Sequence, residues 1–225
     1  MLSFAPQAVL FDLDGTLVDT APDFVRVLNA IRVRHGRSAL PYDTVRAVVS
    51  AGARAMVQTG FPEYGLESPE FLALRNEFLD LYAQELAVES RLFDGMTAVL
   101  EVLEGRRIPW GIVTNKPRVY SEPLLAGLAL DRRCGVLVCP DDVSRTKPDP
   151  EPMLLACRTL AVEPSRTVYV GDHVRDIEAG RNAGMPTIAA AWGYIAPGES
   201  ADDWRADFRA DRVEDLVRLL AISPL

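Results

Sequence analysis

Short, mostly apolar runs recur along the chain and alternate with amphipathic segments in its second half. The runs are residues 8–13, 110–114, 135–139, 167–171 and 187–190. Runs of this length are typical of strands buried on both faces of a sheet. The predicted helices between them are residues 97–104, 121–130, 152–160 and 176–183, and a last helix is predicted to open at residues 211–214. Alternation of this kind predicts right-handed crossovers, so we expect a doubly wound, mostly parallel α/β sheet.

One long segment departs from this alternation. Between residues 22 and 89, apolar residues recur three and four positions apart, and no strand-like run interrupts them. This spacing is typical of helices that bury one face. Ser68 is followed by proline and glutamate, as at the first turn of a helix. We therefore expect a helical cap domain at residues 18–90, inserted after the first strand of a core made of residues 1–17 and 91–225.

Polar residues that could bind a ligand or take part in catalysis lie at, or after, the ends of four of the five runs. They are Asp12, Asp14, Thr114, Asn115, Lys147 and Asp172. In open sheets of parallel strands, ligands bind beyond the carboxyl ends of the strands. Residues from both ends of the chain are therefore predicted to meet at one edge of the sheet.

These residue types suit phosphoryl transfer. Asp12 and Asp14 lie two positions apart, so their carboxylates can face one site, where a divalent cation such as Mg²⁺ would relieve their repulsion. Lys147 and the Thr114 hydroxyl can neutralise phosphate oxygens. We predict Asp12 as the nucleophile and Asp14 as the general acid and base. Asp176 is expected behind the metal ligands, although direct contact or a structural role would explain it equally well.

Composition narrows the class of partner. The net charge of −8 argues against nucleic acid and anionic membranes, since both bind cationic surfaces. The chain opens without a basic leader, and its cysteines form no ligand or disulfide motif. We expect a cytoplasmic protein, monomeric or homodimeric, that acts on a small-molecule phosphate monoester and binds neither nucleic acid nor membrane.

Four motifs in this order resemble those of the haloacid dehalogenase-like (HAD) phosphatases. They are residues 11–16 (FDLDGT), 114–117 (TNKP), 147–148 (KP) and 171–176 (GDHVRD). The resemblance covers nearly the whole chain and implies a HAD-like Rossmannoid core and an aspartyl-phosphate intermediate. It implies Mg²⁺ bound by Asp12, Asp172 and the main-chain carbonyl of Asp14. It also implies that Lys147 steadies the phosphoaspartate.

Further segments narrow the resemblance within this family. Those similar to the phosphoglycolate phosphatase-like group are residues 17–24 (LVDTAPDF), 113–117 (VTNKP) and 146–150 (TKPDP). Those similar to the N-acetylmuramic acid 6-phosphate phosphatases of peptidoglycan recycling are residues 50–56 (SAGARAM), 139–141 (CPD) and 192–195 (WGYI). The resemblance implies N-acetylmuramic acid 6-phosphate as the substrate, with 2-phosphoglycolate as the alternative. Asn115, Gly52 and Arg54 are candidate phosphate or substrate contacts, although Arg54 would equally suit a solvated helix face.

A phosphoacceptor signalling domain is the alternative from a different functional class. Such domains also place acids and a lysine at the end of a parallel sheet, but they lack a helical insert of this size. Within the family, a dehalogenase would not need Asp14. A phosphomutase differs in how tightly the cap closes, and the sequence leaves that alternative open.

Overall fold

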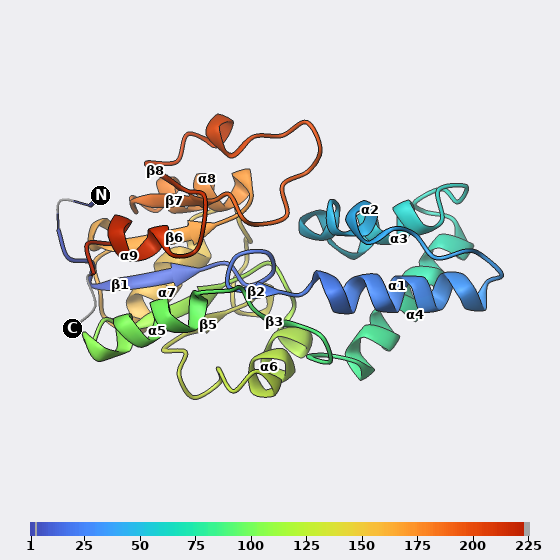
Figure 1. The fold of residues 1–225 in the computed structure, drawn as a ribbon, viewed down its shortest axis with the longest axis horizontal. Helices are drawn as coiled ribbons and strands as arrows, with labels where there is room; N and C mark the ends of the chain where they lie inside the picture. The colour runs from blue at the N-terminus through green and yellow to red at the C-terminus, as the bar shows by residue number, and fades with distance from the viewer. Residues whose placement is uncertain (3, 223–225) are drawn as a thin grey trace.

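The computed structural model describes residues 1–2 and 4–222 and consists of two adjoining parts (Figure 1). The strands are β1 (Ala8–Phe11), β2 (Val18–Asp19), β3 (Arg91–Leu92), β4 (Trp110–Val113), β5 (Leu137–Val138), β6 (Thr167–Gly171), β7 (Thr187–Ala190) and β8 (Phe208–Ala210). The α-helices are α1 (Ala21–Arg34), α2 (Tyr42–Arg46), α3 (Gly52–Gly60), α4 (Pro69–Gln84), α5 (Met96–Gly105), α6 (Arg118–Gly127), α7 (Glu151–Leu160), α8 (Val174–Asn182) and α9 (Asp215–Leu219). Short 3₁₀ segments are η1 (Val49–Ala51), η2 (Pro140–Asp142), η3 (Pro164–Arg166) and η4 (Ala201–Trp204).

Six parallel strands form the main sheet, in the order β5-β4-β1-β6-β7-β8. Successive side chains of the central strand β1 point to opposite faces, as the pleat requires. Val9 and Phe11 pack in one apolar core with residues of α5, α6 and α9, whereas Leu10 packs in another with residues of α7 and α8. Helices therefore cover both faces, and the predicted doubly wound α/β fold is confirmed.

Two features near the C-terminal end differ from the prediction. The sequence pattern does not predict β8, because this short edge strand has an exposed arginine at its centre and gives no apolar run. The last helix begins at Asp215 rather than at residues 211–214. The Asp215 carboxylate accepts hydrogen bonds from the main-chain N–H groups of Asp211 and Arg212, which holds these residues in a turn ahead of the helix.

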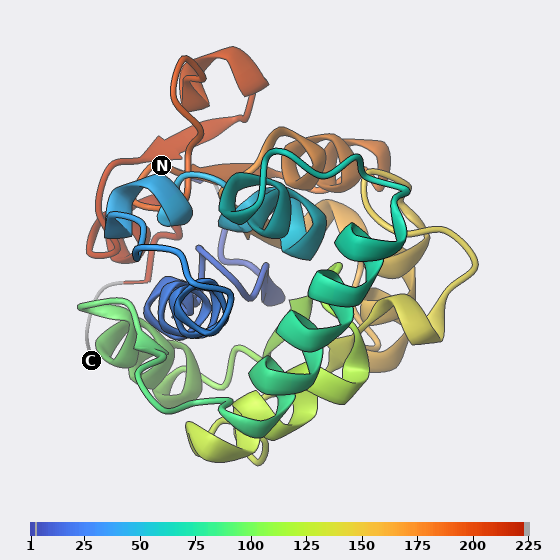
Figure 2. The ribbon, with the colours of Figure 1, turned by 90° about the vertical axis from the view of Figure 1, so that its right-hand side faces the viewer.

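Helices α1 to α4 form the second part of the molecule and enclose a second apolar core, to which Tyr194 of the sheet part also contributes. Figure 2 looks onto this part, with α1 nearly end-on and α4 crossing beside it. The Ser68 hydroxyl accepts a hydrogen bond from the main-chain N–H of Phe71 (3.2 Å), so Ser68 is the N-cap of α4 and the predicted helix start is confirmed. The chain crosses between the two parts twice, and at these crossings the short strands β2 and β3 pair antiparallel, with Val18 opposite Leu92.

Asp23, in the first turn of α1, links the two crossing segments by hydrogen bonds. Its buried carboxylate accepts hydrogen bonds from the main-chain N–H groups of Glu89 (2.9 Å) and Ser90 (3.0 Å) and from the Ser90 hydroxyl. Arg26 pairs with the same carboxylate at 2.9 Å. Burial raises the pKa of Asp23, but the hydrogen bonds from Ser90, Arg26 and Glu89 outweigh it, and the pKa lies below its ordinary value.

Asp23→Asn is expected to lower the free energy of unfolding by about 2 kcal/mol at neutral pH, because hydrogen bonds to a charged acceptor are lost. A carboxyl group whose pKa is lowered by folding stabilises the protein above its unfolded pKa, near 3.8, and this contribution is lost as the pH falls through the folded value. The difference between variant and wild type should therefore shrink in acid. Urea unfolding of both proteins at neutral pH and near pH 3 measures it; an equal difference at both would assign the effect to packing.

Candidate active site

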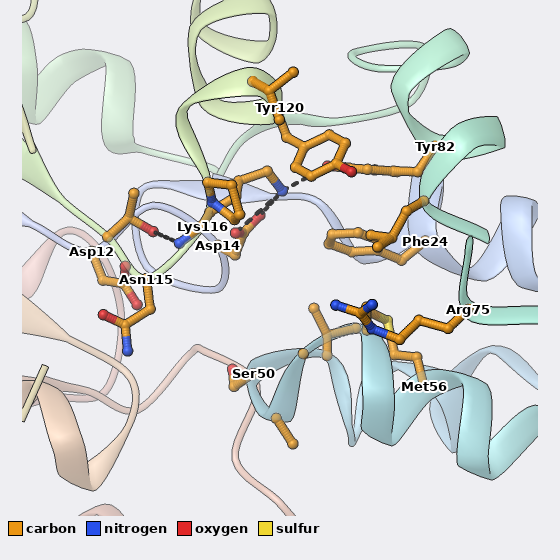
Figure 3. Close-up of a pocket in the computed structure, with 18 of the residues that line it drawn as sticks. Asp12, Asp14, Phe24, Ser50, Met56, Arg75, Tyr82, Asn115, Lys116 and Tyr120 are labelled. Atoms are coloured by element: carbon orange, nitrogen blue, oxygen red, sulfur yellow. Dashed lines mark hydrogen bonds and ion pairs between the residues drawn. The ribbon is translucent and has the colours of Figure 1, made fainter. Parts of the chain in front are cut away.

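Most of the predicted site residues converge at the carboxyl end of the sheet, beside a cavity of about 530 Å³ that the helical part also lines (Figure 3). Asp12, Asp14, Gly52, Thr114 and Asn115 are among the described residues that line this cavity. Lys147, Asp172 and Asp176 lie close to Asp12.

Lys147 provides a buried positive charge behind Asp12. Its side chain has no exposed surface, and its ammonium lies 2.9 Å from Asp12 Oδ1 and 2.7 Å from Asp176 Oδ1. It also donates hydrogen bonds to the main-chain carbonyl of Val113 and to the Tyr169 hydroxyl, both at 3.0 Å. Burial alone lowers the pKa of Lys147, but the two carboxylates outweigh it and raise the pKa above its ordinary value. The ammonium is therefore held in its charged form.

Asp172 is buried close to Asp12. Its carboxylate accepts hydrogen bonds from the Thr16 hydroxyl (3.0 Å), the Ser50 hydroxyl (3.1 Å) and the main-chain N–H of Tyr194 (2.9 Å). Burial raises the pKa of Asp172 to about 7, and the charges of neighbouring carboxylates add to the effect. Gly15 makes this arrangement possible: its φ is +83°, and a Cβ there would lie 2.2 Å from Asp172 Oδ2.

Three of the acids form a cluster that suits a cation. Asp12, Asp172 and Asp176 each place a carboxylate oxygen within 4.8 Å of the others, and all three side chains are buried. Lys147 contributes one positive charge, so the group retains a negative excess. The donors are hard oxygens, which fit Mg²⁺. The cluster includes Asp176, for which we predict a place behind the ligands; whether it contacts the metal directly stays a prediction.

Asp14 lines the cavity and is held by different partners. Its carboxylate accepts a hydrogen bond from the Thr20 hydroxyl (2.7 Å) and pairs with the Lys116 ammonium (3.0 Å). Lys116 also donates to the Tyr82 hydroxyl on α4 (2.7 Å) and lies 4.6 Å from the ring centres of Phe24 and Tyr82. Asp14 is thus connected to the helical part through Lys116. This lysine is not among the site residues predicted from the sequence, although its place in the TNKP segment after a strand is a usable signal.

Thr114 and Asn115 come directly after β4. The Thr114 hydroxyl accepts a hydrogen bond from the main-chain N–H of Lys116 (3.1 Å). The Asn115 side chain makes two hydrogen bonds with the main chain of Lys147. It accepts one from the Lys147 N–H (3.2 Å) and donates one to the Lys147 carbonyl (3.1 Å). Asn115 therefore anchors the segment that carries Lys147, while its predicted contact with phosphate stays a prediction.

The two predicted cap residues lie in different surroundings. Gly52 begins α3 with φ +84° and lines the cavity, with open space where a Cβ would be. Arg54 pairs with Glu67 at 2.7 Å, is half exposed and is not among the described residues that line the cavity. Arg75 of α4 lines it instead. The sequence cannot distinguish these two arginines, because both lie on predicted helices and only the packing of α3 against α4 decides which one faces inward.

Comparison with known proteins agrees with this geometry. Residues 9–190 match the model of the haloacid dehalogenase-like hydrolases. The chain belongs to this family. A HAD-type relative from Pseudomonas aeruginosa, an N-acetylmuramic acid 6-phosphate phosphatase, is 49% identical over 95% of this chain and 94% of its own. A second protein of that name, from Pseudomonas putida, is 46% identical over 95% and 96%.

Other relatives of this chain are named phosphoglycolate phosphatases. A phosphoglycolate phosphatase from Xanthomonas campestris is 41% identical over 94% of this chain and 95% of its own. The crystal structure of a predicted phosphoglycolate phosphatase from Haemophilus somnus superimposes with a TM-score of 0.84 at 24% identity, covering 97% and 99% of the two chains. That likeness supports the fold alone. The predicted resemblance to both groups of the family is confirmed.

None of the helices in the described part of the chain combines the length and the apolar character needed to cross a membrane.

Proposed function

We propose that this protein is a Mg²⁺-dependent phosphatase that hydrolyses a small phosphate monoester through an aspartyl-phosphate intermediate. The observation that carries the proposal is the position of Asp12. Its carboxylate lines the cavity, pairs with Lys147 at 2.9 Å, and belongs to the cluster of three buried acids. The proposed nucleophile therefore lies next to a fixed positive charge and to oxygen donors that suit a metal. Residues 18–90 are the proposed cap over this site.

The reaction takes place in two displacements. An Asp12 oxygen forms a bond to phosphorus as the bond to the ester oxygen breaks, and Asp14 gives its proton to the departing alcohol. Asp14 then takes a proton from water, whose oxygen forms a bond to phosphorus as the bond between phosphorus and the Asp12 oxygen breaks; inorganic phosphate leaves and the Asp12 carboxylate is regenerated. Lys147 counters negative charge on the transferred group and on the Asp12 carboxylate. The Thr114 hydroxyl is a further donor to the phosphate oxygens.

The acid cluster fits a bound Mg²⁺ for two reasons. Its donors are hard oxygens, and the negative charge of its three carboxylates exceeds the single positive charge of Lys147. Asp12, Asp172 and the main-chain carbonyl of Asp14 would hold the ion, with Asp176 behind them. When bound, the ion would supply positive charge to the phosphoryl oxygens and would offset repulsion between the Asp12 carboxylate and the substrate.

N-acetylmuramic acid 6-phosphate is the proposed substrate. Identities of 49% and 46% to phosphatases named for it exceed the 41% identity to a phosphoglycolate phosphatase. A cavity of about 530 Å³ is in the range of sites for small molecules. The 41% identity favours 2-phosphoglycolate as the second candidate. A cytoplasmic location and a monomeric or homodimeric state stay predictions.

A phosphate-release screen with Mg²⁺ tests the proposal. N-acetylmuramic acid 6-phosphate is expected to be hydrolysed with a kcat/KM at least about tenfold above that of 2-phosphoglycolate or a hexose phosphate, a difference of about 1.4 kcal/mol in transition-state binding. Removal of Mg²⁺ with EDTA should abolish turnover, and added Mg²⁺ should restore it. A preference for 2-phosphoglycolate would select the second candidate. A single phosphorylation event without turnover would instead support a phosphoacceptor domain.

A further inference from the structure

The cavity contains a positive charge that the steps above do not use. Three cationic side chains line the cavity within the described residues: Lys116, Arg175 and Arg75. Lys116 pairs with Asp14, and Arg175 donates a hydrogen bond to the main-chain carbonyl of Ser50. Arg75 has neither a hydrogen bond nor an ion pair in the described part of the chain, and its Nε is buried without a partner.

Among the described residues, no carboxylate lies within ion-pair distance of Arg75. The positions three and four residues away on its own helix are apolar, namely Phe71, Leu72, Phe78 and Leu79. Figure 3 shows its guanidinium pointing away from α4 into the cavity, beside Phe24 and Met56. The two acids that line the same cavity already have cationic partners, since Asp12 pairs with Lys147 and Asp14 with Lys116.

An unpaired guanidinium beside apolar side chains is a strong site for an anion. Partial burial removes water from the charge, so an incoming anion gains more there than at an open surface. The planar fork of arginine donates two parallel hydrogen bonds to a carboxylate. The phosphate is expected elsewhere, because Asp12 and Lys147 come from the core, whereas Arg75 is presented by α4 of the helical part.

We propose that Arg75 determines specificity by binding a carboxylate at the end of the substrate remote from the phosphate. This rests on the proposed phosphatase function and deepens it: the substrates are phosphate monoesters that also carry a carboxylate. Both candidate substrates belong to that class, since one carries a lactyl carboxylate and the other a glycolate carboxylate. Phosphate esters that lack this group would leave Arg75 unpaired and bind less well.

The test compares two sugar phosphates that differ in the lactyl group alone, N-acetylmuramic acid 6-phosphate and N-acetylglucosamine 6-phosphate. Arg75→Gln is expected to raise KM for the first about 30-fold, the loss typical of a hydrogen-bonded charge pair, with little change in kcat. KM for the second sugar phosphate and for p-nitrophenyl phosphate should stay the same. Arg75→Lys should recover part of the loss, because it restores the charge without the fork.

Arg34→Gln is the matched control, because Arg34 is also an arginine of the helical part but is exposed and lies 3.7 Å from Glu77. This variant should have the wild-type KM for all three substrates. Equal wild-type kinetics with the two sugar phosphates would overturn the proposal and leave the phosphatase function standing. An equal loss by Arg75→Gln on all three substrates would also overturn it, since Arg75 would then act on the phosphate.

A binding measurement separates this proposal from the catalytic one. Calorimetric titration with N-acetylmuramic acid, which keeps the carboxylate and lacks phosphate, requires no turnover. The Arg75→Gln variant should bind it about 30-fold more weakly than wild type, with an unchanged melting temperature. Equal affinity of the two proteins, or no binding by either, would overturn the role of Arg75. Absence of phosphate release from every ester by wild type would count against the proposed function instead.

Discussion

Replacing Asp12 with asparagine is expected to reduce phosphate release by at least about 10⁴-fold, the scale seen when a covalent nucleophile is removed. The amide of asparagine is a poor nucleophile and cannot form the acyl phosphate. Lys147 and Asp172 stay in place in this variant. The loss should therefore appear in kcat for every phosphate ester, including activated aryl esters. Steady-state kinetics with p-nitrophenyl phosphate and with the sugar phosphate measure it.

The same variant should remain folded, for an electrostatic reason. Asp12, Asp172 and Asp176 hold three carboxylates within 4.8 Å of one another, and Lys147 keeps Asp176 as a partner at 2.7 Å when Asp12 is neutral. Removing one of three like charges relieves repulsion in the absence of metal. The melting temperature without Mg²⁺ should be at least that of wild type. The rise in melting temperature on adding Mg²⁺ should be smaller, because one ligand is weaker.

Asp202→Asn is a suitable control for the loss of one carboxylate. Asp202 is exposed, pairs with Arg209 and lies in η4, outside the cavity lining. Turnover by this variant should equal that of wild type. Turnover by Asp12→Asn close to the wild-type rate, together with a native circular dichroism spectrum, would contradict the nucleophile assignment.

The core of the site could be predicted because its parts are local signals at strand ends. Asp12 and Asp172 each follow an apolar run, and the carboxyl ends of parallel strands share one edge of the sheet. This rule brings residues from both ends of the chain together without any knowledge of side-chain packing. The convergence of Asp12 and Asp172 follows from the observed strand order, which places β1 beside β6. The position of Lys147, nine residues beyond the end of β5, also depends on the hydrogen bonds that its main chain makes with Asn115.

The cavity wall could not be predicted in the same way. Lys116 reaches Asp14 and Tyr82 because α4 approaches the end of β4, and this approach depends on how two parts of the molecule pack. Arg75 and Arg54 likewise differ in surroundings rather than in sequence pattern. A helical arginine on a partly apolar stripe fits a solvated face and a ligand site equally well. Specificity therefore depends on tertiary packing that a single sequence does not encode in any local pattern.

Replacing Lys147 with methionine is expected to reduce both activity and stability. Methionine has similar length and no charge, so the variant leaves Asp12 and Asp176 buried beside each other without the ammonium that contacts both. Loss of one partner from a buried ion pair typically costs about 3–5 kcal/mol. Loss of a fixed charge beside the transferred phosphoryl group typically costs about 10³-fold in kcat. Urea unfolding without metal and steady-state kinetics with Mg²⁺ measure the two effects.

Mg²⁺ should stabilise Lys147→Met more than it stabilises wild type. Without Lys147, the cluster of Asp12, Asp172 and Asp176 retains its negative charge and binds a cation more tightly, and tighter binding to the folded state raises the melting temperature further. Lys116→Met is the matched control, because Lys116 is also buried and pairs with an aspartate but contacts Asp14 instead. The rise in melting temperature that Mg²⁺ causes in this control should equal the rise in wild type. An identical rise in all three proteins would mean that the acid cluster is not where the ion binds.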